Sequence, residues 1–473
     1  MINRYLASQI KLNFPFTPTS EQEIAIDRLS EFLLSDDDRK VFLLCGYAGT
    51  GKTSLISALV RTMEQLERKT TLLAPTGRAA KVFSSYSGKS ARTIHKCIYR
   101  QKSIMDSATF TLTANRAQNT LFIVDEASMI SNNGNAMTGS CGLLDDLIEF
   151  VYSGHGCSLL LLGDTAQLPP IGEVQSPALT ESYLRSMFLN VTSVELKQVM
   201  RQLNDSGILF NATMLRQRIE EEETYELPQI TLKGFADICN VQGEELIEAI
   251  ESSYNKAGID ETIILCRSNK RANVYNEGIR RRILYREEEL SRGDMLMIVK
   301  NNYHYAEHDK ESPMTFVANG DVVRLKRIRR FEEFYGFRFI DATLQFPDYD
   351  DYLMDAKVML DTLSSESPSL TREQSKELFL EVEKDYLDIK AKNKRYREIR
   401  ENPYFNAMQV KFAYAVTCHK AQGGQWSVVF IDRCLFGDEP ISKDMLRWLY
   451  TAITRATEKV YLVNFDERFF DAE

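Results

Sequence analysis

The stretch from Val41 to Thr53 constrains the fold more than any other part of the chain. It opens with the apolar run VFLLC, which predicts a buried strand, and continues through glycines into the helical pattern SLISALV. Between the two lies GYAGTGKT, a G-x-x-x-x-G-K-T pattern that starts at Gly46. In this setting, backbone N–H groups and the positive end of the helix can hold phosphate oxygens. We expect Lys52 to reach the β- and γ-phosphates and Thr53 to bind Mg²⁺.

Most residues of this loop are expected to contact a nucleotide. They are Gly46, Ala48, Gly49, Thr50, Gly51, Lys52 and Thr53. Just upstream, a turn-rich stretch leads into a helix expected to start near Thr19 or Ser20, where Ser20 and Glu23 have the spacing of a capping box. Gln22 lies on the first turn of this helix. Its amide can pair with a donor and an acceptor on the edge of adenine, and plain solvation is the alternative.

Two acidic residues close the next core strand. The apolar run TLFIV, from residue 120, ends in Asp125 and Glu126. Adjacent carboxylates at the end of a buried strand are costly unless a cation lies opposite them. We therefore expect Asp125 to bind Mg²⁺, mostly through water, and Glu126 to polarise the attacking water; a surface turn is the alternative. A further apolar run, SLLLLGD, precedes Gln167, whose amide is expected to hydrogen-bond the γ-phosphate or the attacking water.

Polar residues also come directly after another predicted strand. Their expected place is the edge of the sheet at which the phosphate loop lies. KTTLLA, from residue 69, ends in Pro75, Thr76 and Arg78. Ligands of open α/β sheets bind at the carboxyl ends of strands, and small polar residues with an arginine suit a sugar–phosphate backbone. Capping of the next helix by Thr76 is compatible with that role. His95, in ARTIHK, is by itself more typical of a core histidine.

The order of these patterns predicts an α/β fold with two RecA-like parallel-sheet lobes. The first lobe is expected over residues 1–190, and the second over 191–290 and 404–473. A polar stretch at about 96–119 predicts a small hairpin insertion in the first lobe. Its Phe110 is either an exposed wedge or a packed strand aromatic. Residues 291–403 interrupt the second lobe with β patterns that fit a small barrel, followed by a charged arm.

The charged arm, over residues 369–400, has a helical pattern. Thr371 and Gln374 have the spacing of a capping box. An apolar stripe follows, formed by Leu378, Phe379, Val382, Tyr386 and Ile389. Such a run is usually a solvated arm. Its basic end, from Lys390, is an alternative contact for phosphates.

Composition limits the class of protein. A chain of 473 residues suggests about three domains. The net charge of −9 gives no overall basic field, so nucleic acid would have to bind in local grooves. The eight cysteines include no C-x-x-C pair, which disfavours zinc or iron–sulfur clusters and fits a reducing compartment. Without an apolar targeting segment or membrane-length run, we expect a cytoplasmic protein. We also expect a monomer.

Taken together and in order, these blocks resemble the superfamily 1B DNA helicases of the RecD/Dda-like branch. The resemblance rests on GYAGTGKT, LLAPTGRAA, ARTIHK, VDEAS, GDTAQLPP, MRQ, IVKNNY with NGD, YAVTCHKAQGGQW and YTAITRA. It implies two RecA-like lobes with ATP between them and single-stranded DNA across their top. It further implies that the hairpin splits duplex DNA and that the barrel is an SH3-like β-barrel that helps to grip DNA. By this resemblance we expect the compact Dda-like form, without the N-terminal extension of longer RecD-type proteins. The charged arm matches no family pattern.

The resemblance also implies roles for individual residues. The adenine, phosphate, Mg²⁺ and general-base roles fall on Gln22, Lys52, Thr53, Asp125 and Glu126. The γ-phosphate sensor and the two arginines expected to stabilise phosphoryl transfer from across the cleft are Gln167, Arg201 and Arg455. Gly423 completes the expected cofactor-binding set. The positions expected to contact the DNA strand are Pro75, Thr76, Arg78, Thr93, His95, Thr417, His419 and Lys420.

The expected function is an ATP-dependent 5′→3′ DNA helicase that acts on single-stranded and tailed duplex DNA, with the polarity taken from the resemblance alone. A translocase without strong unwinding, or an enzyme acting on RNA, is the alternative within the same class. A P-loop kinase for a small molecule would not account for Thr417, His419 and Arg455. A binding module without hydrolysis would not account for Lys52 and Glu126.

Overall fold

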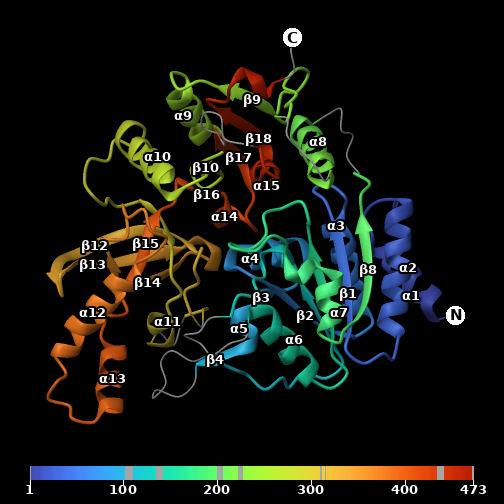
Figure 1. Ribbon diagram of the computed structural model, residues 1–473, viewed down its shortest axis with the longest axis horizontal. Helices are drawn as coiled ribbons and strands as arrows, with labels where there is room; N and C mark the ends of the chain where they lie inside the picture. Colours follow the sequence, from blue (N-terminus) through green and yellow to red (C-terminus); the bar gives the residue numbers. More distant parts are fainter. Residues whose placement is uncertain are drawn as a thin grey trace.

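The computed structural model describes residues 2–101, 110–134, 142–199, 206–221, 227–308, 312–314, 316–433 and 441–470. Figure 1 shows a first lobe at the lower right, a second lobe above it, and a barrel with a helical arm at the left. Within the described ranges, no helix has the length and apolar character needed to cross a membrane. The expected α/β class with two lobes and an inserted barrel is confirmed.

The first lobe is a parallel sheet of six strands in the order β3-β2-β6-β7-β1-β8. Its strands are β1 (Lys40–Gly46), β2 (Lys69–Ala74), β3 (Ala91–Thr93), β6 (Thr120–Val124), β7 (Ser158–Gly163) and β8 (Asn190–Leu196). Its helices are α1 (Ile2–Asn13), α2 (Ser20–Leu34), α3 (Lys52–Gln65), α4 (Gly77–Ser87), α5 (Ile94–Ile98), α6 (Leu143–Ser153) and α7 (Glu181–Ser186), with short 3₁₀ turns η1 (Ala127–Met129) and η2 (Pro177–Leu179).

Helices cover both faces of this sheet, which explains its continuous apolar runs. On β1, Phe42 and Leu44 pack in one cluster with residues of α1 to α4. Val41 and Leu43 point to the other face, into a cluster with residues of α5, α6 and α7. Each such fully buried side chain contributes about 1.5–3 kcal/mol relative to exposure. The carboxyl ends of the strands are thereby held along one rim.

The second lobe is a parallel sheet of five strands in the order β16-β10-β17-β18-β9. Its strands are β9 (Ile238–Val241), β10 (Thr262–Cys266), β16 (Ala415–Thr417), β17 (Trp426–Asp432) and β18 (Ala456–Val463). Its helices are α8 (Gly207–Glu220), α9 (Leu246–Lys256), α10 (Asn269–Arg282), α14 (Cys418–Ala421) and α15 (Lys443–Ile453), followed by the 3₁₀ turn η5 (Glu467–Phe469).

A closed barrel is inserted between α10 and β16. It consists of β11 (Met295–Ile298), β12 (Val322–Phe334), β13 (Phe337–Phe346), β14 (Tyr352–Met359) and β15 (Met408–Phe412), with α11 (His304–His308) and the 3₁₀ turn η4 (Pro347–Tyr349) in its connections. The arm follows β14 as two helices, α12 (Arg372–Lys384) and α13 (Lys392–Glu401).

The barrel also contacts the first lobe. Nζ of Lys81, on α4, lies 2.8 Å from Oδ1 of Asp348 in η4 of the barrel.

Several local expectations need correction. Two strands belong to other domains than expected. The strand β8 was expected in the second lobe, which was predicted to begin at residue 191, but it pairs with β1 of the first lobe. The strand β15 was expected in the second lobe, after residue 403, but it closes the barrel. The capping box of α2 is formed by Thr19 and Gln22, not by Ser20 and Glu23, because the chain turns into the helix one residue earlier. The arm is two helices and the first ends at Lys384, so the expected stripe is broken after Val382, and Tyr386 and Ile389 lie between the helices.

Other local expectations are confirmed where the structure describes them. Thr371 and Gln374 form the predicted capping box of α12. The insertion in the first lobe has a hairpin base, formed by β4 (Tyr99–Gln101) and β5 (Phe110–Leu112). Its tip, over residues 102–109, lies outside the described residues, as does the side chain of Phe110. The role of Phe110 as a wedge therefore stays a prediction.

Candidate nucleotide and nucleic-acid site

The phosphate loop between β1 and α3 has the backbone that its glycines predict. Gly49 and Gly51 have φ values of +78° and +84°, in the left-handed region that glycine adopts without strain. The ammonium group of Lys52 donates to the carbonyl oxygens of Gly46, at 2.6 Å, and Tyr47, at 2.9 Å. Thr53 is exposed on the first turn of α3. The loop thus presents the lysine, the hydroxyl and the helix N-terminus that a nucleotide phosphate requires.

Gln22 links the first turn of α2 to the phosphate loop. Its side chain is buried, its Nε2 donates to the carbonyl oxygen of Thr50 at 2.9 Å, and its Oε1 accepts from the N–H of Thr19 at 3.0 Å. The sequence interpretation placed this amide near the nucleotide, and the structure places it directly behind the loop. Recognition of adenine by Gln22 stays a prediction.

Asp125 and Glu126 lie at the carboxyl end of β6. The carboxylate of Asp125 accepts from the hydroxyl of Tyr86 at 2.6 Å and from the N–H of Glu126 at 2.8 Å. Burial, together with the charge of Glu126, raises the pKa of Asp125 to about 6. A buried carboxylate beside a second acid is stabilised by a cation, so these residues suit Mg²⁺. The contact from Tyr86 was not predicted, because no local pattern connects α4 with the end of β6.

Arg455, from the second lobe, reaches this acidic pair in the first lobe. Its Nη1 lies 3.8 Å from Oε1 of Glu126, and its side chain is only 4% exposed. The guanidinium is held by the carbonyl oxygens of Thr451 and Gly424, each at 3.2 Å. The structure therefore brings together two residues that the sequence interpretation assigned to opposite sides of one site. The other predicted arginine, Arg201, lies outside the described residues.

A tyrosine on α15 joins the two lobes at the phosphate loop. The hydroxyl of Tyr450 accepts from the N–H of Ala48 at 3.0 Å and donates to Oδ2 of Asp164 at 2.6 Å. Close by, the N–H of Leu168 donates to the hydroxyl of Thr451 at 2.9 Å. Tyr450 and Thr451 were not predicted as site residues. Their motif, YTAITRA, was recognised, and its helical spacing was the available signal.

Gln167 lies beside this contact in the first lobe. Its side chain is 8% exposed, and among the described residues its Oε1 has no hydrogen-bond partner. Gln167 lines a cavity of about 270 Å³ that also includes Ser128 of the first lobe and Arg447 of the second. An acceptor without a protein partner beside a cavity is available to a donor from a bound ligand or a water molecule.

In the first lobe, the residues predicted to contact DNA follow β2 and β3. Pro75 is half-buried, directly ahead of the N-cap of α4. The hydroxyl of Thr76 accepts from the N–H of Ala79, and that of Thr93 accepts from the N–H of Lys96, so each threonine caps a helix. His95 is half-buried, and burial lowers the pKa of its imidazole. The two threonines are thereby fixed at the rim.

In the second lobe, the predicted residues follow β16. Thr417 begins α14 without a hydrogen bond from its side chain to the helix. Burial lowers the pKa of His419, and lowers that of Lys420 to about 8. Lys420 donates to Oδ1 of Asn319 in the barrel. This DNA candidate is therefore anchored where the second lobe meets the barrel.

Two predicted site residues lie between the lobes. The guanidinium carbon of Arg78 lies 3.9 Å from the centre of the Trp426 ring, and its Nη2 donates to the carbonyl oxygen of Gln425 at 3.1 Å. Gly423 has φ +74°, and a Cβ there would lie 2.8 Å from Cβ of Ala79. The sequence interpretation assigned Arg78 to the DNA backbone and Gly423 to the cofactor. In the structure, each contacts the opposite lobe.

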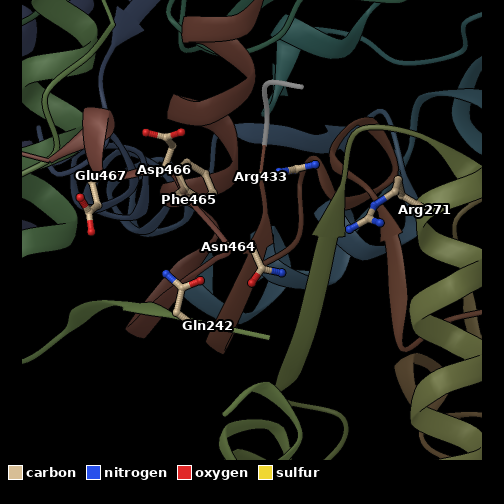
Figure 2. A pocket seen from close by; sticks show the side chains of 7 residues that line it. All are labelled: Gln242, Arg271, Arg433, Asn464, Phe465, Asp466 and Glu467. Atoms are coloured by element: carbon tan, nitrogen blue, oxygen red, sulfur yellow. The ribbon is translucent and has the colours of Figure 1, made fainter. Parts of the chain in front are cut away.

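A further cavity, of about 650 Å³, opens at the carboxyl ends of β9, β17 and β18 (Figure 2). It is lined by Gln242, Arg271, Arg433, Asn464, Phe465, Asp466 and Glu467. Arg271 is held by a bidentate ion pair with the buried Asp432, at 2.6 and 2.8 Å. The sequence interpretation did not identify this cavity, because its lining residues come from separate strand ends.

Two family models match the chain. The AAA domain matches residues 19–227, which include the first lobe from α2 to β8, and the UvrD-like helicase C-terminal domain matches residues 412–463, from the end of the barrel to β18. Among curated relatives, an uncharacterised protein of Acanthamoeba polyphaga mimivirus is 23% identical over 526 residues, covering 93% of this chain and 98% of the viral protein.

Another relative has a name that states an activity. The ATP-dependent RecD2 DNA helicase of Deinococcus radiodurans is 28% identical over 192 residues, which are 40% of this chain and 23% of that helicase. Among solved structures, a Bacteroides Pif1 helicase with ADP-AlF3 and ssDNA has a TM-score of 0.48 at 14% identity. That alignment covers 97% of this chain and 95% of the Pif1 chain.

The two family models occur in the order of the two lobes, and the residues they include carry the phosphate loop, the acidic pair and Arg455. The RecD2 relative is itself named an ATP-dependent DNA helicase. The chain therefore carries the two domains expected of a RecD-like superfamily 1B helicase, and is a nucleotide-binding, ATP-hydrolysing DNA helicase.

Proposed function

We propose that this protein moves 5′→3′ along single-stranded DNA and unwinds tailed duplexes, driven by ATP hydrolysis. The observation that carries the proposal is the approach of Arg455 to Glu126 from the opposite lobe, at 3.8 Å. Because one lobe supplies the acids and the other a positive charge, hydrolysis depends on how closely the lobes approach. Lobe closure and phosphoryl transfer are then coupled, which is the requirement for a motor.

The nucleotide site is proposed to use the predicted residues in distinct roles. Lys52 binds the phosphates, Thr53 and Asp125 hold Mg²⁺, and Glu126 orients and deprotonates the attacking water. When bound, Mg²⁺ offsets phosphate charge. The raised pKa of Asp125 supports this arrangement, because a carboxylate without a nearby cation is costly there.

The remaining predicted nucleotide contacts are proposed as follows. Gln22 reads adenine, the unpartnered Oε1 of Gln167 responds to the γ-phosphate or the water, and Arg201 acts as the second arginine. For Gly423 we propose a contact with the first lobe instead of the nucleotide, since a Cβ at this position would meet Thr76 and Ala79.

The DNA strand is proposed to lie over the β3 edge of the first sheet and the β16 edge of the second. Thr76, Thr93 and His95 would contact the strand from one lobe, and Thr417, His419 and Lys420 from the other. Hydroxyl and imidazole groups suit sugar–phosphate contacts. With a contact set on each lobe, alternate release during opening and closing produces steps. Arg78 is proposed to couple the lobes through Trp426 rather than to contact DNA.

The division of the chain into a first lobe, a split second lobe, and a barrel with an arm is proposed to be functional as well. The first lobe carries the nucleotide and the hairpin that separates strands. The barrel, which contacts Lys81 of the first lobe and Lys420 of the second, supports the strand from the side.

The test is unwinding of duplexes that carry a 5′ tail, a 3′ tail or no tail, with ATP and Mg²⁺. We expect separation of the 5′-tailed duplex only, and none by Lys52→Ala. Separation of only the 3′-tailed duplex would refute the polarity. ATP turnover stimulated by single-stranded DNA, without strand separation, would show a translocase, and stronger stimulation by RNA would show an RNA-directed enzyme. Turnover without any nucleic-acid stimulation would refute the motor.

A further inference from the structure

The connection between β11 and β12 carries two of the five histidines in the chain, one helical turn apart. His304 and His308 begin and end α11, and a spacing of four residues puts both side chains on one face of the helix. Their ring centres are 4.4 Å apart. Glu401, the last residue of α13 in the arm, reaches the same place. Its Oε2 lies 3.1 Å from Nε2 of His308 and 4.0 Å from Nδ1 of His304.

We propose that His304, His308 and Glu401 bind a divalent transition-metal ion, of which Zn²⁺ is the best match, and that the ion joins the barrel to the arm. The three ligand atoms all lie within 4.8 Å of one another. Bonds of about 2.0–2.2 Å in a tetrahedral site place ligand atoms roughly 3.4 Å apart. The observed separations of 3.1 and 4.0 Å lie on either side of that value.

The tautomer of His308 favours a cation at this position. Nδ1 of His308 lies 2.7 Å from the backbone carbonyl oxygen of His304, which can only accept a hydrogen bond. Nδ1 is therefore the protonated nitrogen, and the lone pair of Nε2 faces the carboxylate of Glu401. Two acceptors at 3.1 Å repel each other unless a proton or a metal ion lies between them. A carbonyl that fixes the tautomer of a ligand histidine is the usual partner in metal sites.

The donor atoms favour a transition-metal ion over Mg²⁺. A neutral imidazole is the form that binds metal. Two nitrogen donors and one carboxylate suit Zn²⁺ or Co²⁺, whereas Mg²⁺ prefers an all-oxygen site.

The surrounding contacts hold the ligands in place before any ion arrives. Nδ2 of Asn302 donates to the carbonyl oxygen of Asn406 at 2.6 Å, which ties the start of this connection to the chain that follows α13. The hydroxyl of Tyr305 accepts from the N–H of Lys357 at 2.9 Å. His308 also lines a cavity of about 480 Å³ on the barrel, which leaves space for a fourth ligand such as water.

The test measures Zn²⁺ binding to the full chain after metal removal, by competition with a chromophoric chelator. His308→Gln and Glu401→Gln remove one ligand each, and both side chains are about half exposed, so the fold is expected to survive. His155→Gln is the matched control, since His155 is exposed and lies outside the cluster. Asp125→Asn controls for binding at the nucleotide site.

We expect one Zn²⁺ per chain in the wild type and in both controls. Loss of a direct ligand should weaken binding at least as much as the ~10–100-fold that loss of a supporting residue costs. Zn²⁺ should raise the Tm of the wild type but not of His308→Gln or Glu401→Gln. Co²⁺ should give a visible absorption band that the same two variants lose.

Unchanged Zn²⁺ affinity in both ligand variants would overturn the proposal. So would equal competition by Mg²⁺, or loss of binding in Asp125→Asn alone, because each would place the ion at the acidic pair. If Zn²⁺ leaves the wild-type Tm unchanged, and Glu401→Gln lowers it without metal, the contact is only an ion pair between His308 and Glu401, and the metal site is refuted. Circular dichroism of the metal-free variants checks that each is folded.

Discussion

The hydroxyl of Tyr450 gives the sharpest test of coupling between the lobes. It accepts a hydrogen bond from Ala48 in the phosphate loop and donates one to Asp164, both in the first lobe, while Tyr450 itself belongs to α15 of the second. Burial raises the pKa of Tyr450 well above its usual range, so the phenol stays protonated and donates. Tyr450→Phe removes this oxygen and little else, since the ring volume is kept.

The magnitude follows from the groups left without a partner. In the closed arrangement, the variant leaves the N–H of Ala48 and a carboxylate oxygen of Asp164 unpaired. A hydrogen bond to a charged group contributes about 1.5–3 kcal/mol. When the lobes separate, water can satisfy both groups, so the cost falls on the closed arrangement alone. A change of that size shifts the balance between closed and open by roughly 10- to 150-fold.

The assay is steady-state ATP hydrolysis with saturating single-stranded DNA. We expect kcat/KM for ATP to fall by about that factor, and the Tm to change little, since each lobe keeps its own sheet and core. Tyr461→Phe is the matched control, because the Tyr461 ring stacks on Phe430 within the second lobe, at 4.5 Å. A Tyr450→Phe protein that is folded and keeps kcat/KM within about twofold of the wild type would refute the reasoning. An equal loss in Tyr461→Phe would point to general destabilisation instead.

The other predictions concern charge. Arg455→Ala should lower kcat about a thousandfold or more with little change in ATP affinity, as for other arginines that reach a transferring phosphoryl group; near-normal kcat would exclude that role. Asp321 is buried, its Oδ1 has no partner among the described residues, and burial raises its pKa to about 7. An acid whose pKa rises on folding stabilises the fold below its unfolded pKa and loses that contribution as the pH rises through about 7. Asp321→Asn should therefore raise the Tm at pH 8 relative to the wild type more than at pH 5, and an equal change at both would contradict the assignment. The affinity for single-stranded DNA should fall steeply with salt, and a flat response would favour base stacking over phosphate contacts.

Some elements were predicted because their cause is local. A run such as VFLLC is apolar throughout, which suits a strand with both faces covered. Gly49 and Gly51 adopt positive φ values without the strain that a side chain would bring. The capping box of α12 was also predicted, whereas that of α2 was misplaced by one residue. Thr19 and Ser20 are both favourable N-cap residues, and the point at which the chain enters the helix decided for Thr19.

Other features depended on which surfaces the fold brings together. Arg78 follows a strand, which suggested a phosphate contact, and the structure adds a contact that the sequence did not indicate, with Trp426 of the other lobe. Tyr86 contacts Asp125 because α4 packs beside β6, and no spacing in the sequence connects the two. The domain boundaries near β8 and β15 were misplaced because both segments have ordinary strand patterns. Only their pairing partners assign β8 to the first sheet and β15 to the barrel.

By itself, the sequence determined the phosphate loop, the acids that follow β6, the apolar strands and the family. Each of these lies within a few consecutive residues, where backbone geometry and periodicity act directly. Only the tertiary structure decided that Arg455 meets Glu126, that Tyr450 holds the loop from the opposite lobe, and that Glu401 joins His304 and His308. The physical reason is reach. A side chain spans a few ångströms, so contacts between residues far apart in sequence depend on how whole sheets, helices and the barrel are set against one another.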